Sequence, residues 1–155
     1  MQKSTYVLQE ALGVPLGFEF TLYKHGPFSF DLSDEITALR GDLLLKVQSR
    51  PPYGASLLPS ENADALMERF PVTRARYEKQ IRFTAEKLAD MGVAELERCA
   101  TAIFVTLENE TDGSLNARAS LIHELKPHIT IPEARSALEW ADALNKEGQH
   151  LEATT

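Results

Sequence analysis

The sequence predicts a mostly helical α+β protein: a winged-helix-like N-terminal half with a small antiparallel sheet, packed on a C-terminal helical bundle. Short helical and strand-like patterns alternate before Pro71, whereas the apolar residues after it recur at helical spacing. The 155 residues, 43% of them hydrophobic, suit one ordinary domain with a real core. We therefore expect a single domain over residues 1–155, with lobes at 1–70 and 71–148 and a frayed tail at 149–155.

The first lobe begins with a helix and a strand. Apolar residues at helical spacing predict a helix over residues 3–12, which Gly13 ends. Large apolar residues that alternate with other residues then predict a strand over residues 18–23, with the large apolar side chains facing the core. We expect Gly26 and Pro27 to end this strand, because proline has no amide hydrogen for a β-ladder and glycine permits a turn.

A second helix and two strands complete a winged-helix order. Ser29 is a good N-cap for a helix over residues 29–41, whose early carboxylates suit the N-terminal end of the helix dipole. Strands are expected over residues 43–50 and 55–58, joined by a Pro-Pro-Tyr-Gly turn at 51–54. In this interpretation the helix is a recognition helix and the turn is the tip of the wing.

Helices fill the rest of the chain. Ser60 is expected to cap a helix that Pro71 closes, and Thr130 with Glu133 forms a capping-box pattern at the start of the last helix. The cleanest amphipathic pattern covers residues 96–107. The predicted helices cover residues 60–70, 73–91, 96–107, 115–126 and 130–148.

The charge of the chain limits its partners. The formal net charge is −7, with −1 in residues 1–60 and −6 in residues 61–155. Nucleic acid and anionic membranes repel an acidic chain, so nucleic acid is an unfavourable partner that stays open, and no membrane partner is expected. The sequence has no apolar signal region and no apolar run long enough to span a bilayer. We therefore expect a cytoplasmic protein.

No pattern in the sequence predicts catalysis, a metal or a cofactor. Cys99 is the single cysteine, which rules out an intramolecular disulfide, and its apolar surroundings predict a small buried side chain. His123 and Glu124 begin like a zinc-protease motif, but His128 follows five residues later across Pro127, and one helix face needs a spacing of three or four. We expect a protein that is not an enzyme, with an unrecognised enzyme as a third alternative.

The segment from Tyr23 to Ser29 contains the most informative residues. Gly26, Pro27, Phe28 and Ser29 have structural tasks, in ending a strand, packing and capping a helix. Tyr23, Lys24 and His25 have none that is obvious. The ring of His25 either bonds nearby backbone and holds the turn or contacts a partner. We therefore take Tyr23, Lys24 and His25 as candidate partner contacts.

The predicted wing offers further contacts. Lys46 and Arg50 lie on one face of the expected strand, and Tyr53 lies at its tip. The exposed face of the predicted helix 29–41 carries three carboxylates and one arginine. Phosphates would repel the carboxylates, which disfavours insertion of this helix into a DNA groove. Two cations on the wing are a small footprint for duplex DNA, and they suit an acidic protein surface equally well. Lys46, Arg50 and Tyr53 complete the candidate contact residues, and an exposed Phe28 or Tyr53 leaves a homodimer open.

Four short motifs are spread over most of the chain: Gln2-Lys3, Tyr6-Val7-Leu8-Gln9, Tyr23-Lys24-His25-Gly26-Pro27-Phe28-Ser29 and Lys126-Pro127-His128. Together they resemble a bacterial family, the SocA-like antitoxin domains of the Panacea superfamily, and its YwgA-like uncharacterised relatives more closely still. The resemblance implies a helical domain with a small sheet that neutralises a toxin or binds another protein. A helix usually precedes the Gln-Lys element in such proteins, so an N-terminal truncation stays open.

Two hypotheses for function follow from these observations. The first is a non-enzymatic protein-interaction module, antitoxin-like or regulatory, that uses the Gly-Pro turn region and the wing as its contact surface. The second is a winged-helix DNA-binding transcriptional regulator, which rests on the order of the elements alone.

Overall fold

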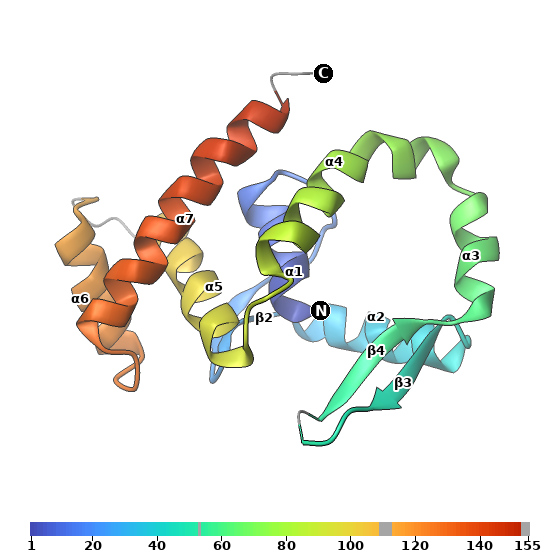
Figure 1. Cartoon of the computed structure of the whole chain (residues 1–155), viewed down its shortest axis with the longest axis horizontal. Coiled ribbons are helices and arrows are strands. Elements are labelled where there is room, and N and C mark those ends of the chain that lie inside the picture. Colours follow the sequence, from blue (N-terminus) through green and yellow to red (C-terminus); the bar gives the residue numbers. More distant parts are fainter. Residues whose placement is uncertain (53, 109–112, 153–155) are drawn as a thin grey trace. The chain divides into compact units, whose positions relative to one another are not determined.

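The computed structural model of the chain describes residues 1–52, 54–108 and 113–152 and has the predicted α+β class. Within them lie seven α-helices, one π-helical turn and two separate two-stranded antiparallel sheets (Figure 1). In chain order the elements are α1 (Gln2–Tyr6), the π-helix η1 (Val7–Ala11), β1 (Thr21–Tyr23), β2 (Gly26–Phe28), α2 (Phe30–Gly41), β3 (Leu45–Ser49), β4 (Ala55–Pro59), α3 (Glu61–Glu68), α4 (Pro71–Leu88), α5 (Val93–Glu108), α6 (Leu115–Leu125) and α7 (Ile131–Glu152).

The chain forms two compact units. The first combines residues 1–29 with residues 79–155, and the second is residues 30–78. These boundaries differ from the expected lobes 1–70 and 71–148, because the N-terminal helix and the first hairpin pack with the C-terminal helices. In the part of the chain that the structure describes, no helix has both the length and the apolarity needed to cross a membrane.

The core of the first unit is formed by α5 with α6, α7 and the N-terminal helix. Helix α7 lies along both α5 and α6 (Figure 1). Small side chains let these helices approach closely, while Tyr6 closes the core with its ring edge-on to Phe20 at 5.0 Å between centroids. The completely buried residues of this core include Ala102, Ile103, Val105, Ala119, Ile122, Ala134, Leu138 and Ala141.

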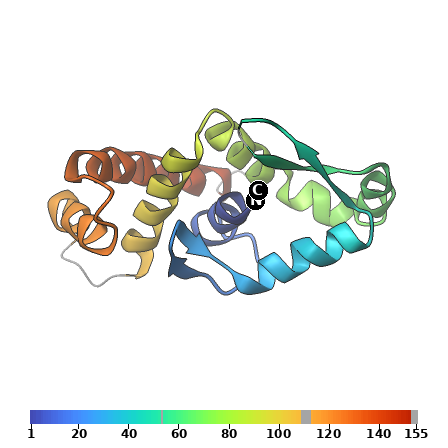
Figure 2. The ribbon, with the colours of Figure 1, turned by 90° about the horizontal axis from the view of Figure 1, so that it is seen from below.

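The hairpin β1–β2 corrects one prediction. The strand expected over residues 18–23 covers only Thr21–Tyr23, and Gly26–Phe28 is a second strand rather than the end of the first. Leu22 lies opposite Pro27, and Lys24 and His25 form the turn between the two strands. The hairpin is part of the blue N-terminal segment in Figure 2. Proline is tolerated here because a two-stranded sheet consists of edge strands, on which one amide can be dispensed with.

The second unit contains the expected small hairpin. Strands β3 and β4 pair antiparallel from Leu45 opposite Pro59 to Ser49 opposite Ala55, close to the predicted ranges. The amide of Arg50 donates to the carbonyl of Gly54 at 2.8 Å and closes the turn. The hydroxyl of Ser60 accepts a hydrogen bond from the amide of Asn62 at 3.1 Å, which confirms the predicted cap of α3.

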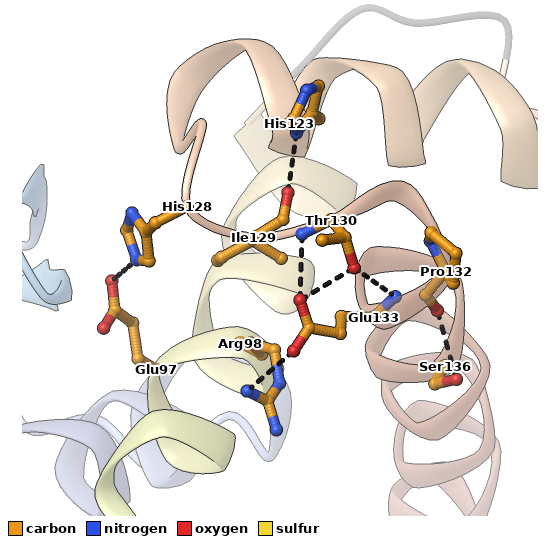
Figure 3. A network of polar contacts seen from close by, with 9 residues as sticks. All are labelled: Glu97, Arg98, His123, His128, Ile129, Thr130, Pro132, Glu133 and Ser136. Carbon is orange, nitrogen blue, oxygen red and sulfur yellow. Dashed lines mark hydrogen bonds and ion pairs between the residues drawn. The ribbon is translucent and has the colours of Figure 1, made fainter.

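Three helix boundaries depart from or sharpen the predictions. Pro71 begins α4 instead of closing α3. Proline suits the first position of a helix because the amide hydrogen that it lacks would have no partner in the helix there. Helix α7 continues to Glu152, so residues 149–152 are helical rather than part of a frayed tail. The predicted capping box is confirmed: the amide of Thr130 donates to Glu133 Oε2 at 2.9 Å, and the amide of Glu133 donates to Thr130 Oγ1 at 3.4 Å (Figure 3).

Candidate functional site

The turn of the β1–β2 hairpin carries three exposed side chains, those of Tyr23, Lys24 and His25. Tyr23 is 56% exposed, and its ring lies 5.8 Å from that of Phe28 on the paired strand. The side chain of His25 is 71% exposed. The turn therefore presents an aromatic ring, an ammonium group and an imidazole to solvent.

A buried carboxylate lies behind this turn. Glu97 on α5 has a side chain that is only 10% exposed, and its Oε1 lies 3.0 Å from Nε2 of His128 (Figure 3). Its Oε2 lies 3.7 Å from Nδ1 of His25, and Oε1 lies 3.9 Å from Nζ of Lys126. A buried charge needs such partners because desolvation is otherwise costly. The ring of His25 therefore lies beside a buried carboxylate, a contact that neither alternative from the sequence included.

Lys126 holds the turn from the side of α6. This residue follows α6 as its C-cap, and its side chain is 8% exposed. Its ammonium donates to the backbone carbonyls of Tyr23 and of Lys24, the latter at 2.7 Å. Burial lowers the pKa of Lys126, and the charge of Glu97 partly offsets that effect. The backbone of the turn is therefore fixed from behind while its side chains stay outside.

The N-terminal helix holds the second strand of the hairpin. Nζ of Lys3 donates to the carbonyl of Pro27 at 2.7 Å. The amide side chain of Gln2 makes two hydrogen bonds with the backbone of Ser29, donating at 3.0 Å and accepting at 2.9 Å. Burial lowers the pKa of Lys3, Glu97 raises it, and Lys126 lowers it further. The Gln2-Lys3 pair thus has a definite structural task at the hairpin.

Gly26 is required by close packing against α5. Its φ of +85° is in the left-handed region that glycine adopts without strain. A Cβ here would lie 3.2 Å from Oγ1 of Thr101 and 3.4 Å from the carbonyl oxygen of Glu97, contacts tighter than, or at the limit of, ordinary packing. The predicted structural role of Gly26 at the turn therefore includes a close approach to a helix.

The charges around Glu97 are predominantly positive. The carboxylate faces Lys126 at 3.9 Å, feels the charge of Lys3, and contacts His25 and His128, which add charge only when protonated. Two lysines against one carboxylate leave a local excess of positive charge in a chain whose formal net charge is −7. Within the described ranges, no group of three or more His, Cys, Asp or Glu side chains is arranged to hold a metal ion. The local charge suits a negatively charged group of a partner.

The two histidines on either side of Pro127 have different partners. Nδ1 of His123 lies 2.7 Å from the carbonyl oxygen of Ile129, whereas His128 contacts Glu97 (Figure 3). Each ring is therefore oriented by its own hydrogen bond.

The structure brings together only some of the predicted contact residues. Tyr23, Lys24 and His25 share one turn of the first unit, while Lys46 and Arg50 are exposed in and next to β3 of the second unit. Tyr53 lies outside the described residues. The site therefore has one assembled part, the hairpin turn.

Sequence reasoning missed the residues that support the turn. Glu97 lies beside the strongest apolar helix pattern and was passed over, and Lys126 entered only through a family motif. The backbone partners of Lys126 are 103 and 102 residues away in the chain. A charged residue next to an apolar helix stripe is the one signal in the sequence that could have indicated Glu97.

Comparison of the chain with models of protein families, with curated proteins and with solved structures finds no match. The function of the hairpin turn is therefore inferred from its own chemistry.

Proposed function

We propose that the protein is a non-enzymatic protein-interaction module, antitoxin-like or regulatory, and that the β1–β2 turn is part of its contact surface. The observation that carries this proposal is the combination of a fixed backbone with exposed side chains at Tyr23, Lys24 and His25. A contact surface that is already ordered loses little conformational entropy on binding. Tyrosine is also among the residues that contribute most to binding at protein interfaces.

The chemistry of the turn favours an acidic partner surface. Lys24 and His25 are exposed, and the excess positive charge behind them is close to the turn. Complementary charge speeds association and selects the correct partner. A toxin or another regulatory protein is the partner that the resemblance to SocA-like antitoxins implies.

The second unit supports an interaction role independently. It exposes several large apolar side chains while it buries few among its described residues. A protein partner or a second copy of this chain would remove these side chains from water. They are Phe30, Leu43, Val47, Leu58, Met67, Phe70 and Val72.

DNA binding is the alternative, and the order of α2, β3 and β4 favours it. Lys46 and Arg50 are exposed on the hairpin that would form the wing. The exposed carboxylates of Asp31, Asp34 and Glu35 on α2 oppose it, because phosphates repel them. A gel shift at moderate salt, with the protein alone and with its partner complex, tests this alternative, and the absence of a specific complex rejects it.

The proposal is tested by co-expression with the products of the adjacent genes. We expect one product to co-purify with the protein, and a toxic product to be neutralised. The variant Lys24→Glu should weaken the complex by about tenfold or more, since it reverses a charge at the contact. The matched control is Lys146→Glu on α7, also exposed, which should bind like the wild type.

Two outcomes contradict this proposal. If no adjacent product binds or is neutralised, the interaction role is rejected. If a complex forms and Lys24→Glu binds as tightly as Lys146→Glu, the turn is not its contact surface.

A further inference from the structure

A pocket separate from the hairpin turn lies between α5 and the beginning of α7. Its volume is about 350 Å³, which is within the range of about 300–1,000 Å³ typical of small-molecule sites. Cys99, Pro132, Ala137 and Trp140 supply apolar lining. Trp140 is the single tryptophan of the chain and is half-buried.

Arg98 is the one positively charged residue that lines this pocket. Its guanidinium reaches from α5 towards Glu133 at the start of α7 (Figure 3). Nη1 lies 3.5 Å from Oε1 of Glu133, at the limit of a hydrogen bond, and the two side chains are 30% and 43% exposed. Among the described residues, Glu133 is the only carboxylate in ion-pair contact with Arg98. A guanidinium has five N–H donors, so most of its hydrogen-bonding capacity is unused by the protein.

Glu133 is a poor partner for Arg98 because it already serves the helix cap. Its Oε2 accepts from the amide of Thr130 at 2.9 Å and from the hydroxyl of Thr130 at 2.8 Å. These hydrogen bonds lower the pKa of Glu133, and the charge of Arg98 lowers it by a smaller amount, so the carboxylate stays ionised at neutral pH. Its position is set by the cap, and the contact with Arg98 stays long.

We propose that this pocket binds a small carboxylate, with the carboxylate paired to Arg98 and an attached aromatic or aliphatic group packed against Trp140 and Ala137. Arginine matches a carboxylate with two parallel hydrogen bonds, which is a better geometry than the 3.5 Å contact with Glu133. Glu95 and Glu133 also line the pocket and oppose any anion, so the ligand carries no more than the one negative charge that pairs with Arg98. The site is independent of the proposed protein partner.

The probe for the test is phenylacetate, and the signal is the fluorescence of Trp140. Because the chain has one tryptophan, the signal reports on the surroundings of Trp140, which lines this pocket. We expect a dissociation constant in the millimolar range, as is usual for a ligand of this size. Phenylacetamide, which has the same shape without the charge, should bind at least about tenfold more weakly. Absence of a saturable change with phenylacetate, or equal binding of the amide, overturns the proposal.

Two variants should move the affinity in opposite directions. Arg98→Met should weaken phenylacetate binding by about tenfold or more, whereas Arg135→Met, an exposed α7 residue outside the pocket lining, should leave it unchanged. Glu133→Gln should strengthen binding by about threefold, because glutamine preserves a capping box while the competing charge is removed. Misfolding cannot produce a gain in affinity. Unchanged affinity in both Arg98→Met and Glu133→Gln rejects the assignment of Arg98.

A carboxylate could reach the pocket from a free acid or from a peptide. The second arm of the titration therefore uses N-acetyl-Gly-Gly-Phe with a free C-terminus and its C-terminal amide. Tighter binding of the peptide acid than of phenylacetate supports a peptide source, and the reverse supports a free small acid. If neither phenylacetate nor the peptide acid binds, the proposed carboxylate site is rejected, and the proposed protein contact at Lys24 is unaffected.

Discussion

The two units of the chain differ in how much apolar surface they bury. In the first unit, Ile103, Ile122 and Leu138 are completely buried between helices. Among the described residues of the second unit, Leu32 is the one buried apolar residue, whereas Phe30 is 59% exposed. The cleanest amphipathic pattern of the sequence, over residues 96–107, belongs to the first unit.

We expect most of the stability of the molecule to come from the first unit. Burial of apolar area is the main favourable contribution to folding, and each helix must bury its apolar face against another element. Both units expose some large apolar side chains, but only the first has a core of buried apolar residues between its helices. The described residues of the second unit bury far less apolar surface. Five predictions test this difference between the units.

Hydrogen exchange should show the largest difference. We expect the central amides of α5 and α7 to exchange about a hundredfold or more slowly than those of α2 and α3, because helices with little buried contact open at low free-energy cost. Native-state exchange measured by NMR or mass spectrometry checks this. Equal protection in α2 and α5 would show that the second unit is as stable as the first.

A matched pair of leucines should separate the units by mutation. Leu138→Ala on α7 should lower the free energy of unfolding by about 2–5 kcal/mol, since it leaves a cavity in a closed core. Leu58→Ala on β4, where the leucine is 36% exposed, should cost roughly 1 kcal/mol or less. Urea denaturation of both variants measures the difference, and similar costs would remove the contrast.

Removal of the Lys126 ammonium tests the support of the hairpin. Lys126→Met should destabilise the protein by about 2–3 kcal/mol, because Glu97 loses a buried partner and two carbonyls lose their donor. The exposed Lys46→Met on β3 is the control and should stay within about 0.5 kcal/mol of the wild type. If the two variants are equally stable in denaturation, the buried cluster contributes little.

One substitution in the second unit should be stabilising. Leu43 has a φ of +58°, which is unfavourable for a residue with a Cβ, and it is 67% exposed. Leu43→Gly should therefore raise the free energy of unfolding by about 0.5–1 kcal/mol. Leu45→Gly, in the neighbouring strand, is the control and should be destabilising. A loss of stability in Leu43→Gly would show that its side chain packs more than its exposure suggests.

The smallest expected effect is the pH dependence of the α7 cap. The pKa of Glu133 lies below its ordinary value because of its hydrogen bonds to Thr130. A carboxyl group with a lowered folded-state pKa stabilises the protein above its unfolded-state value, and this contribution is lost as the pH falls through the folded-state value. The melting temperature should therefore fall slightly less between neutral and acid pH in Glu133→Gln than in the wild type. An identical acid limb in both would exclude a contribution from this cap.

Much of the local structure could be predicted from the sequence. The cap of α3 at Ser60, the capping box at Thr130 and the β3–β4 hairpin follow from residue types whose hydrogen bonds are local. Pro27 misled the prediction because its strand has only one partner, so the missing amide hydrogen is harmless. The boundary at Pro71 failed for a similar reason, since proline fits the first turn of a helix as well as the end of one.

The candidate site was predictable only in its exposed half. Tyr23, Lys24 and His25 were identified because no local structural task accounts for them. Their support depends on Glu97 and Lys126, which meet the turn only after α5 and α6 have packed. The Arg98 pocket had no signal in the sequence, because it requires the start of α7 to lie beside α5.

The α+β class, the main helices and the caps at Ser60 and Thr130 could be predicted from the sequence, because they depend on spacing and hydrogen bonds within a few residues. Which apolar faces form the core and which stay exposed depends on how the elements pack. Tertiary structure also decided that Lys126 would meet the carbonyl of Lys24, 102 residues away. Such contacts are set by how helices pack, and packing depends on the shapes of whole surfaces rather than on any local pattern.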